Sequence, residues 1–170
     1  RFRQGYPEKI GGWQRISSTT FKGVCRSLWN WVTLGSINLL GVGTNLKFYL
    51  EEGGAYNDIT PIRSTTAAGD VTFSATNGSS TISVTDAGHG AIADDFVTFS
   101  GAVSLGGNIT AAVLNQEYQV DAVQDANTYT ITAKDTAGAT VTANSSDSGN
   151  GGSSVVGAYQ INTGQAYAIP

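Results

Sequence analysis

The sequence predicts an all-β protein: a four-stranded antiparallel, blade-like meander that forms part of a β-propeller, with an inserted small β-sandwich or barrel domain. Three observations lead to this prediction. Apolar and polar residues alternate with a period of two over several short runs. Gly, Asn, Asp and Pro separate these runs, as turns require. The chain holds 22 glycines, only 13% charged residues and much Thr and Val, a composition typical of sheets.

The meander is expected in residues 1–63. Four strands are predicted between residues 25 and 61, in "CRSLWNWVTL", "INLLGV", "LKFYLEE" and "AYNDITP". Gly35-Ser36 predicts a two-residue hairpin in which glycine supplies the positive φ of a type II′ turn. Gly43-Thr44-Asn45 and Gly53-Gly54 predict the two following turns.

Both faces of the first predicted strand carry bulky apolar side chains. Trp29 and Trp31 lie on one face, and Leu28, Val32 and Leu34 lie on the other. A sheet this small cannot bury two apolar faces, and no helix is predicted nearby. Sheets of this kind pack face to face in β-propellers. We therefore expect further blades outside these 170 residues or in another subunit.

Gly41, Gly43 and Lys47 do not predict a phosphate-binding loop. Such a loop requires a helix directly after the glycines, whereas the residues that follow alternate as in a strand. A dinucleotide loop would also need a third glycine where this chain has Leu46. No cofactor is expected.

The remaining residues predict an inserted domain between two linkers. Residues 64–69 are expected to form a linker, residues 70–143 the inserted domain, residues 144–154 a flexible Gly/Ser linker, and residues 155–170 a strand that returns toward the propeller. Within the inserted domain we expect a helical turn at residues 111–116 and strands at residues 70–75, 81–85, 95–100, 117–123, 127–133 and 138–143.

The charges divide unevenly along the chain. Residues 1–63 hold eight Lys/Arg against four Asp/Glu, a net +4, whereas residues 64–170 hold one lysine against nine acidic residues, a net −8. An acidic surface binds nucleic acid poorly, because affinity for phosphates depends on cations. The basic residues of the first region are scattered, which favours solvated strand edges. No apolar run approaches the ~18 residues of a membrane span, so no membrane anchor is expected.

The titratable residues predict no catalytic or metal site. His89 lies near Asp86, Asp94 and Asp95 in a glycine-rich stretch that indicates a solvated loop, and a transition metal would lack ligands there. Asp94 and Asp95 are adjacent in a predicted strand, so their side chains point to opposite faces. Glu51-Glu52 is expected at a solvated strand end, and we expect no enzyme activity.

Aromatic residues leave a sugar-binding role open. Trp13, Trp29, Trp31 and Tyr49 could form a stacking platform, although tryptophans that alternate within a strand are more often part of a core. Trp13 and Tyr49 are the candidates for surface recognition. Cys25 is expected to be a small buried apolar residue.

Five segments in succession resemble the N-terminal region of tail nozzle or tail tube (tail tubular) proteins of short-tailed bacteriophages. These segments are "GYPEKIGGWQRI", "CRSLWNWVTLGSINLLGVGTNLKFYLEEGGAYNDITPIR", "DDFVTFSGAVSLGGNITAAVLNQEYQV", "ANTYTITA" and "GAYQINTG". In that family the propeller continues after the last segment with a Gly/Trp-rich run. The resemblance therefore implies that this sequence is a partial chain.

The resemblance also implies a structural role in the virion. The expected assembly is a homo-oligomeric ring, commonly a hexamer, below the tail adaptor and portal, through which the genome is retained and ejected. Viral DNA would pass without specific binding, and no residue would be catalytic. Two alternatives remain: a carbohydrate-binding or host-surface adhesion module of a phage tail, and an enzyme domain that would need two of the four carboxylates Glu51, Glu52, Asp94 and Asp95 in one cleft.

Overall fold

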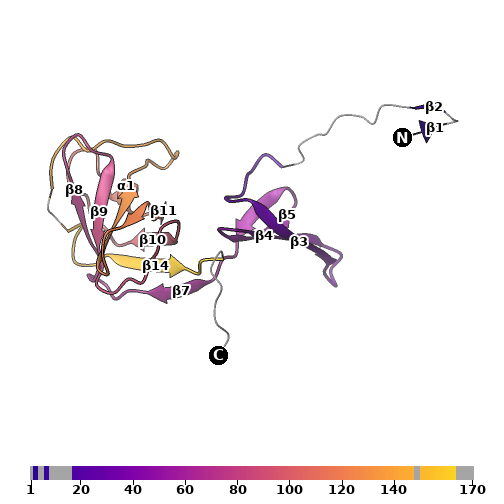
Figure 1. The fold of residues 1–170 in the computed structure, drawn as a ribbon, viewed down its shortest axis with the longest axis horizontal. Helices are drawn as coiled ribbons and strands as arrows, with labels where there is room; N and C mark the ends of the chain where they lie inside the picture. The colour runs from indigo at the N-terminus through magenta and orange to yellow at the C-terminus, as the bar shows by residue number, and fades with distance from the viewer. Residues whose placement is uncertain (1, 4–5, 8–16, 148–149, 164–170) are drawn as a thin grey trace. The chain divides into compact units, whose positions relative to one another are not determined.

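Figure 1 shows the computed structural model, which describes residues 2–3, 6–7, 17–147 and 150–163. The chain divides into two compact units, Arg1–Ile59 and Thr60–Pro170, here called the N-terminal and C-terminal units. Their described residues form antiparallel sheets and one short helix, α1 (Ala111–Leu114). The predicted all-β fold is therefore confirmed.

The N-terminal unit contains the predicted meander. β1 (Phe2–Arg3) and β2 (Tyr6–Pro7) form a two-stranded sheet. The main sheet has the order β3-β4-β5-β6 and is antiparallel throughout. Its strands are β3 (Cys25–Val32), β4 (Asn38–Thr44), β5 (Phe48–Glu52) and β6 (Ala55–Asp58).

The β3–β4 hairpin differs from the predicted turn. The Thr33 N–H donates to the Ile37 carbonyl at 2.9 Å, so the loop has three residues, 34–36, instead of two. Ser36 adopts the positive φ, 62°, and Gly35 does not. A type I turn followed by a left-handed residue is the usual three-residue hairpin. The prediction that Gly35 supplies the positive φ was wrong.

The β4–β5 turn lies further along the chain than predicted. Gly43 and Thr44 belong to β4, and the turn is formed by Asn45-Leu46. The Thr44 N–H donates to the Lys47 carbonyl at 2.9 Å, and the Lys47 N–H donates to the Thr44 hydroxyl oxygen at 2.8 Å. The Thr44 side chain therefore stabilises the turn. The prediction of a Gly43-Thr44-Asn45 turn did not include this contribution.

The C-terminal unit contains two four-stranded antiparallel sheets. One has the order β11-β10-β14-β7 and the other the order β12-β13-β9-β8. The strands of the first are β7 (Ile62–Thr65), β10 (Phe96–Ser100), β11 (Glu117–Gln119) and β14 (Val156–Gln160). Those of the second are β8 (Thr72–Ala75), β9 (Thr81–Thr85), β12 (Ala122–Val123) and β13 (Thr128–Thr132).

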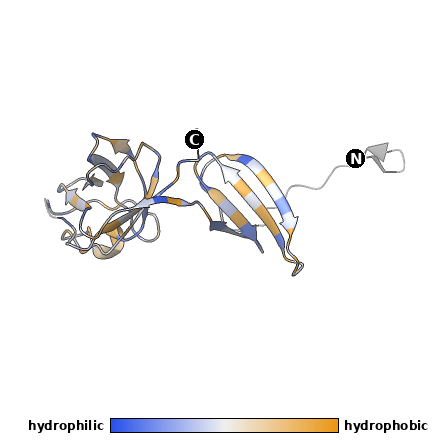
Figure 2. Cartoon of the chain, turned by 90° about the horizontal axis from the view of Figure 1, so that it is seen from below, coloured by the Kyte–Doolittle hydropathy of each residue, from blue (hydrophilic) through white to orange (hydrophobic). Residues whose placement is uncertain are grey.

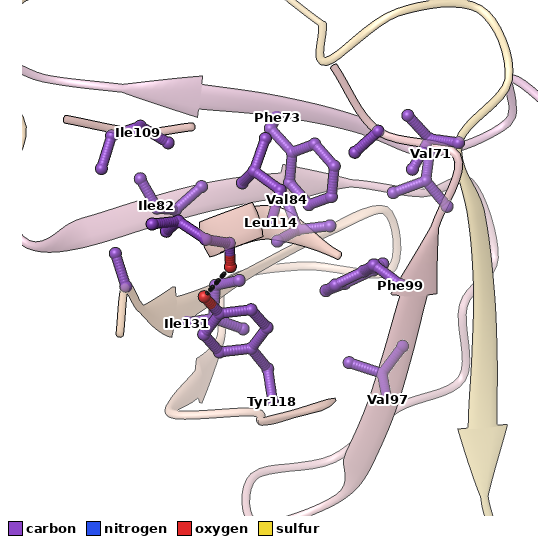
Figure 3. Close-up of a cluster of buried hydrophobic side chains, with 14 of the residues drawn as sticks. Val71, Phe73, Ile82, Val84, Val97, Phe99, Ile109, Leu114, Tyr118 and Ile131 are labelled. Atoms are coloured by element: carbon purple, nitrogen blue, oxygen red, sulfur yellow. Dashed lines mark hydrogen bonds between the residues drawn. The ribbon is translucent and has the colours of Figure 1, made fainter. Parts of the chain in front are cut away.

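The apolar core of the C-terminal unit lies between these sheets (Figure 3). Phe73 on β8 meets Phe99 on β10 edge to face, with ring centroids 4.9 Å apart. The Tyr118 hydroxyl donates to the Val113 carbonyl, the bond dashed in Figure 3, and so satisfies a backbone group of α1 within the core. This arrangement is a β-sandwich.

The boundaries of the sandwich lie outside the predicted range of residues 70–143. Residues 62–65 form β7, where the sequence predicted the start of a linker at residue 64. β14 pairs with both β10 and β7 and contributes Tyr159, which is 1% exposed, to the core. The predicted return strand therefore pairs inside the C-terminal unit, and residues 164–170 of that prediction lie outside the described residues.

The stretch from residue 138 onward also differs from its prediction. Residues 138–143 do not form the predicted strand. Within them, Thr140 makes an isolated β-bridge with Lys134. In the predicted flexible linker, Asp147 forms a bridge with Ala75, and the Gly151 carbonyl accepts from the Val103 N–H at 2.6 Å. The described part of residues 144–154 is therefore hydrogen-bonded to the sandwich.

Candidate functional site

One face of the N-terminal sheet is apolar and exposed. We call it the tryptophan face and define it by Trp29, Trp31, Leu39, Phe48, Leu50 and Ile59, which the strand register places on one side. Trp29 is 74% exposed, Trp31 39% and Phe48 37%. Figure 2 shows apolar positions recurring along these strands. Exposed apolar patches of this kind mark interaction sites.

Glycines keep the centre of the tryptophan face flat. A Cβ on Gly41 would lie 3.4 Å from the Trp31 ring, and a Cβ on Gly43 would lie 2.4 Å from Ser27 Oγ. Both glycines therefore leave room for the side chains of the neighbouring strand β3 to lie across β4.

The opposite face of the sheet is partly covered by residues 17–24. Phe21 packs on Tyr49 and Tyr56, with ring centroids 6.0 and 5.1 Å apart. The Lys22 N–H donates to the Tyr49 hydroxyl at 3.0 Å. On the same face Lys47, which is 1% exposed, forms an ion pair with Asp58. Lys47 therefore has a structural partner.

Of the two predicted recognition residues, the structure describes Tyr49 alone. Tyr49 is 6% exposed, so it is a core residue of the N-terminal unit and not a surface residue. Trp13 lies outside the described residues. Trp29 and Trp31, for which a core position was favoured, are exposed because no residue in the described part of the chain covers them on the edge strand β3. Cys25, predicted to be buried, is exposed on the same strand.

A hydrogen-bonded polar cluster lies inside the C-terminal unit. The hydroxyls of Tyr129 and Tyr159 are 2.8 Å apart, and Tyr159 donates to Asp86 Oδ2 at 2.6 Å. Burial is the main cause that raises the pKa of both tyrosines far above the ordinary value. Both side chains therefore stay protonated and can donate at any physiological pH.

His89 packs against this cluster and is 8% exposed. Its ring meets Tyr129 edge to face at 4.9 Å. The Ala91 N–H donates to Nδ1 at 2.8 Å, so Nε2 carries the proton that faces the Asp125 carbonyl at 3.2 Å. The prediction of a solvated loop was wrong for His89 and for Asp86, which is 4% exposed, because both pack against tyrosines distant in sequence.

Asp94 and Asp95 have different partners, and neither lies in a strand, so the prediction that they occupy opposite faces of a strand was wrong. Asp95 is 3% exposed; it accepts from Asn162 at 2.8 Å and lies 3.3 Å from the Arg63 guanidinium. Asp94 is exposed in the turn before β10, with a φ of 71°, and accepts from Gln119 at 3.0 Å. The two carboxylates therefore do not face one bond.

Of the two glutamates at the end of β5, Glu51 bonds to the turn that follows. Glu51 accepts from the Gly54 N–H at 2.7 Å, and Glu52 is exposed. Across the described ranges, no three His, Cys, Asp or Glu side chains are grouped so that they could hold a metal ion. The described part of the chain also contains no helix with the length and apolar character needed to cross a membrane.

Known proteins show little similarity to this chain. No family model matches the sequence, and no curated protein matches it. Among solved structures, the Phage phi92 endosialidase is similar with a TM-score of 0.38 and 16% identity, over 81% of this chain and 18% of that one. The chain thus spans less than a fifth of that neighbour's length. A similarity this weak carries no argument about function.

Proposed function

We propose that this protein is a structural component of a bacteriophage tail, a tail nozzle or tail tube subunit that works in the virion and not as an enzyme. The observation that carries the proposal is the exposed tryptophan face. Burying apolar surface stabilises by about 25 cal/mol per Å², so a sheet with Trp29 at 74% exposure gains much from a neighbour. The choice of a phage tail as the assembly rests on the resemblance of the sequence to tail nozzle and tail tube proteins.

In this proposal the subunits form a homo-oligomeric ring, with six as the expected number, that joins the tail adaptor. The tryptophan face packs on further β-structure of the ring. Residues 64–170 carry a net charge of −8, which would let DNA pass the channel without adhering.

Sedimentation velocity and negative-stain electron microscopy of the purified chain test the proposal. We expect concentration-dependent association into ring-shaped particles. Trp29→Thr should abolish it, whereas Leu28→Thr, an exposed position on the other face of β3, should not. A chain that stays monomeric at every concentration, or a loss of association in Leu28→Thr alone, would contradict the proposal.

The aromatic pair favours a second candidate function, host-surface adhesion through carbohydrate. Trp29 and Trp31 lie two residues apart on one face and are both solvent-accessible, as a sugar-stacking row requires. Titration with bacterial surface oligosaccharides, followed by tryptophan fluorescence, separates the candidates. Saturable quenching that Trp31→Ala removes would favour adhesion, and unchanged fluorescence would leave the structural role.

A further inference from the structure

A hollow of about 250 Å³ opens in the C-terminal unit beside the edge strand β7. On one side it is lined by Ser64 and Thr66, and on the other by Asp86 and His89 from the loop that follows β9. Tyr159 on β14 also contributes to the wall. The hollow therefore lies where an edge of one sheet meets a loop of the other.

Asp86 offers this hollow an unused hydrogen-bond acceptor. Its Oδ2 accepts from Tyr159 at 2.6 Å, while no group among the described residues donates to Oδ1. The residue is 4% exposed, and Oδ1 is not one of the buried side-chain oxygens that lack a partner, so this oxygen reaches solvent and is open to a ligand. A donor supplied by a ligand in the hollow would satisfy Oδ1.

The other polar groups of the wall are hydroxyls and a second carboxylate. Ser64 lies directly opposite Tyr159 in the strand register. The Thr66 oxygen accepts from the Gly157 N–H at 2.9 Å, which leaves its O–H to donate. Asp70 is exposed at the rim and accepts from the Ala67 N–H at 3.1 Å. The lining includes no lysine and no arginine.

We propose that this hollow binds a single neutral sugar unit, whose hydroxyl groups donate to Asp86 and exchange hydrogen bonds with Ser64 and Thr66. Sugar hydroxyls both donate and accept hydrogen bonds, so they can donate to the carboxylate of Asp86 and can donate to or accept from the hydroxyls of Ser64 and Thr66. The two carboxylates of the wall disfavour phosphate, sulfate and acidic sugars, since the nearby Arg63 guanidinium is paired with Asp95. The volume is below the ~300–1,000 Å³ of sites for drug-sized ligands, which suits one ring. This site is separate from the tryptophan face and does not depend on the proposed assembly.

Nuclear magnetic resonance of the full ¹⁵N-labelled chain tests this proposal. The probes are the methyl glycosides of glucose, galactose, mannose and N-acetylglucosamine, each titrated to saturation. We expect the amide signals of Thr66, Gly88 and His89 to shift saturably with at least one of them. N-acetylneuraminic acid and n-butylamine, an acidic sugar and a simple ammonium ion, should leave these signals in place.

Variants show whether the carboxylate acts as argued. Asp86→Asn should raise the Kd about tenfold or more, the range for a hydrogen bond to a charged group. Asp94→Asn, an exposed carboxylate away from the hollow, is the matched control and should leave the Kd unchanged. Because Asp86→Asn also alters the Tyr159 contact, Ser64→Ala, which changes only an exposed side chain, should weaken binding severalfold without affecting the core signals.

Three results would overturn the proposal. The first is the absence of saturable shifts around the hollow with all four glycosides. The second is equal binding of n-butylamine or N-acetylneuraminic acid. The third is a Kd that Ser64→Ala and Asp86→Asn leave unchanged, or that Asp94→Asn raises equally. Shifts confined to tryptophan-face signals would instead support the adhesion candidate and count against the hollow.

Discussion

Tyr159 joins the two sheets of the C-terminal unit through its hydroxyl group. It donates to Asp86 and contacts the Tyr129 hydroxyl, while the Arg63 guanidinium lies 5.4 Å from the centre of its ring. These partners are separated by up to 96 positions in sequence, so no local pattern marks Asp86 as buried. The sequence around Asp86 is rich in glycine and acidic residues, and this composition predicted a solvent-exposed loop.

The buried tyrosines predict that the C-terminal unit loses stability at alkaline pH. Burial raises the pKa of Tyr118, Tyr129 and Tyr159 in the folded state, whereas the unfolded chain ionises near 10.0. The unfolded state therefore binds fewer protons above that pH, and the free energy of unfolding should fall by up to about 1.4 kcal/mol per pH unit for Tyr129 and for Tyr159, with a contribution of the same sign from Tyr118. Urea unfolding followed by circular dichroism from about pH 8 to about pH 11 measures this.

Tyr159→Phe should reduce that alkaline slope by one tyrosine. At neutral pH the same variant should lower the free energy of unfolding by about 1–3 kcal/mol, because Asp86 loses its donor. Tyr56→Phe, in the N-terminal unit, is the control and should change neither quantity for the C-terminal unit. A slope that is flat in the unaltered protein would show that these tyrosines ionise freely.

The strands differ in how well their sequences predict them. The meander was predictable, since apolar alternation and nearby turns fix the pairing of consecutive strands β3 to β6. β7 and β14 were not assigned to the sandwich, because they pair with each other across more than 90 residues. Residues 144–154 resemble a linker by composition, yet backbone groups in their described part bond to the sandwich, which composition does not reveal.

Gly101, directly after β10, shows how closely that stretch packs. Its φ is +75°, and a Cβ there would lie 2.2 Å from the Ser154 carbonyl oxygen. Gly101→Ala should therefore lower the free energy of unfolding by about 3 kcal/mol, from backbone strain and overlap together. Gly78, with a φ of +82° and no atom within 4 Å of such a Cβ, is the matched control, and Gly78→Ala should cost about 1 kcal/mol. Chemical denaturation compares the two, and equal losses would mean that residues 150–154 are not packed as described.

The two units differ greatly in how much apolar surface they bury. Among the described residues of the N-terminal unit, the buried apolar side chains are Val42 and Tyr49. The C-terminal unit has a continuous core that runs from Val71 to Tyr159. Stability should follow this difference, because buried apolar surface is the main favourable contribution to folding.

We expect the whole chain to unfold in two transitions. All three tryptophans belong to residues 1–59, so their fluorescence reports the N-terminal unit alone. That signal should change at a lower urea concentration than the circular dichroism of the C-terminal unit, because the smaller core unfolds first. Coincident transitions would indicate that the units stabilise each other as one cooperative body.

The central place of β14 has a consequence for biosynthesis. This strand lies between β10 and β7, although it is the last of the three to leave the ribosome. In a nascent chain that has reached only residue 155, β7 and β10 both lack β14, the strand with which each of them pairs. The sandwich can therefore close only after residues 156–160 have left the ribosome, and a chain truncated before Val156 should be captured by chaperones or degraded.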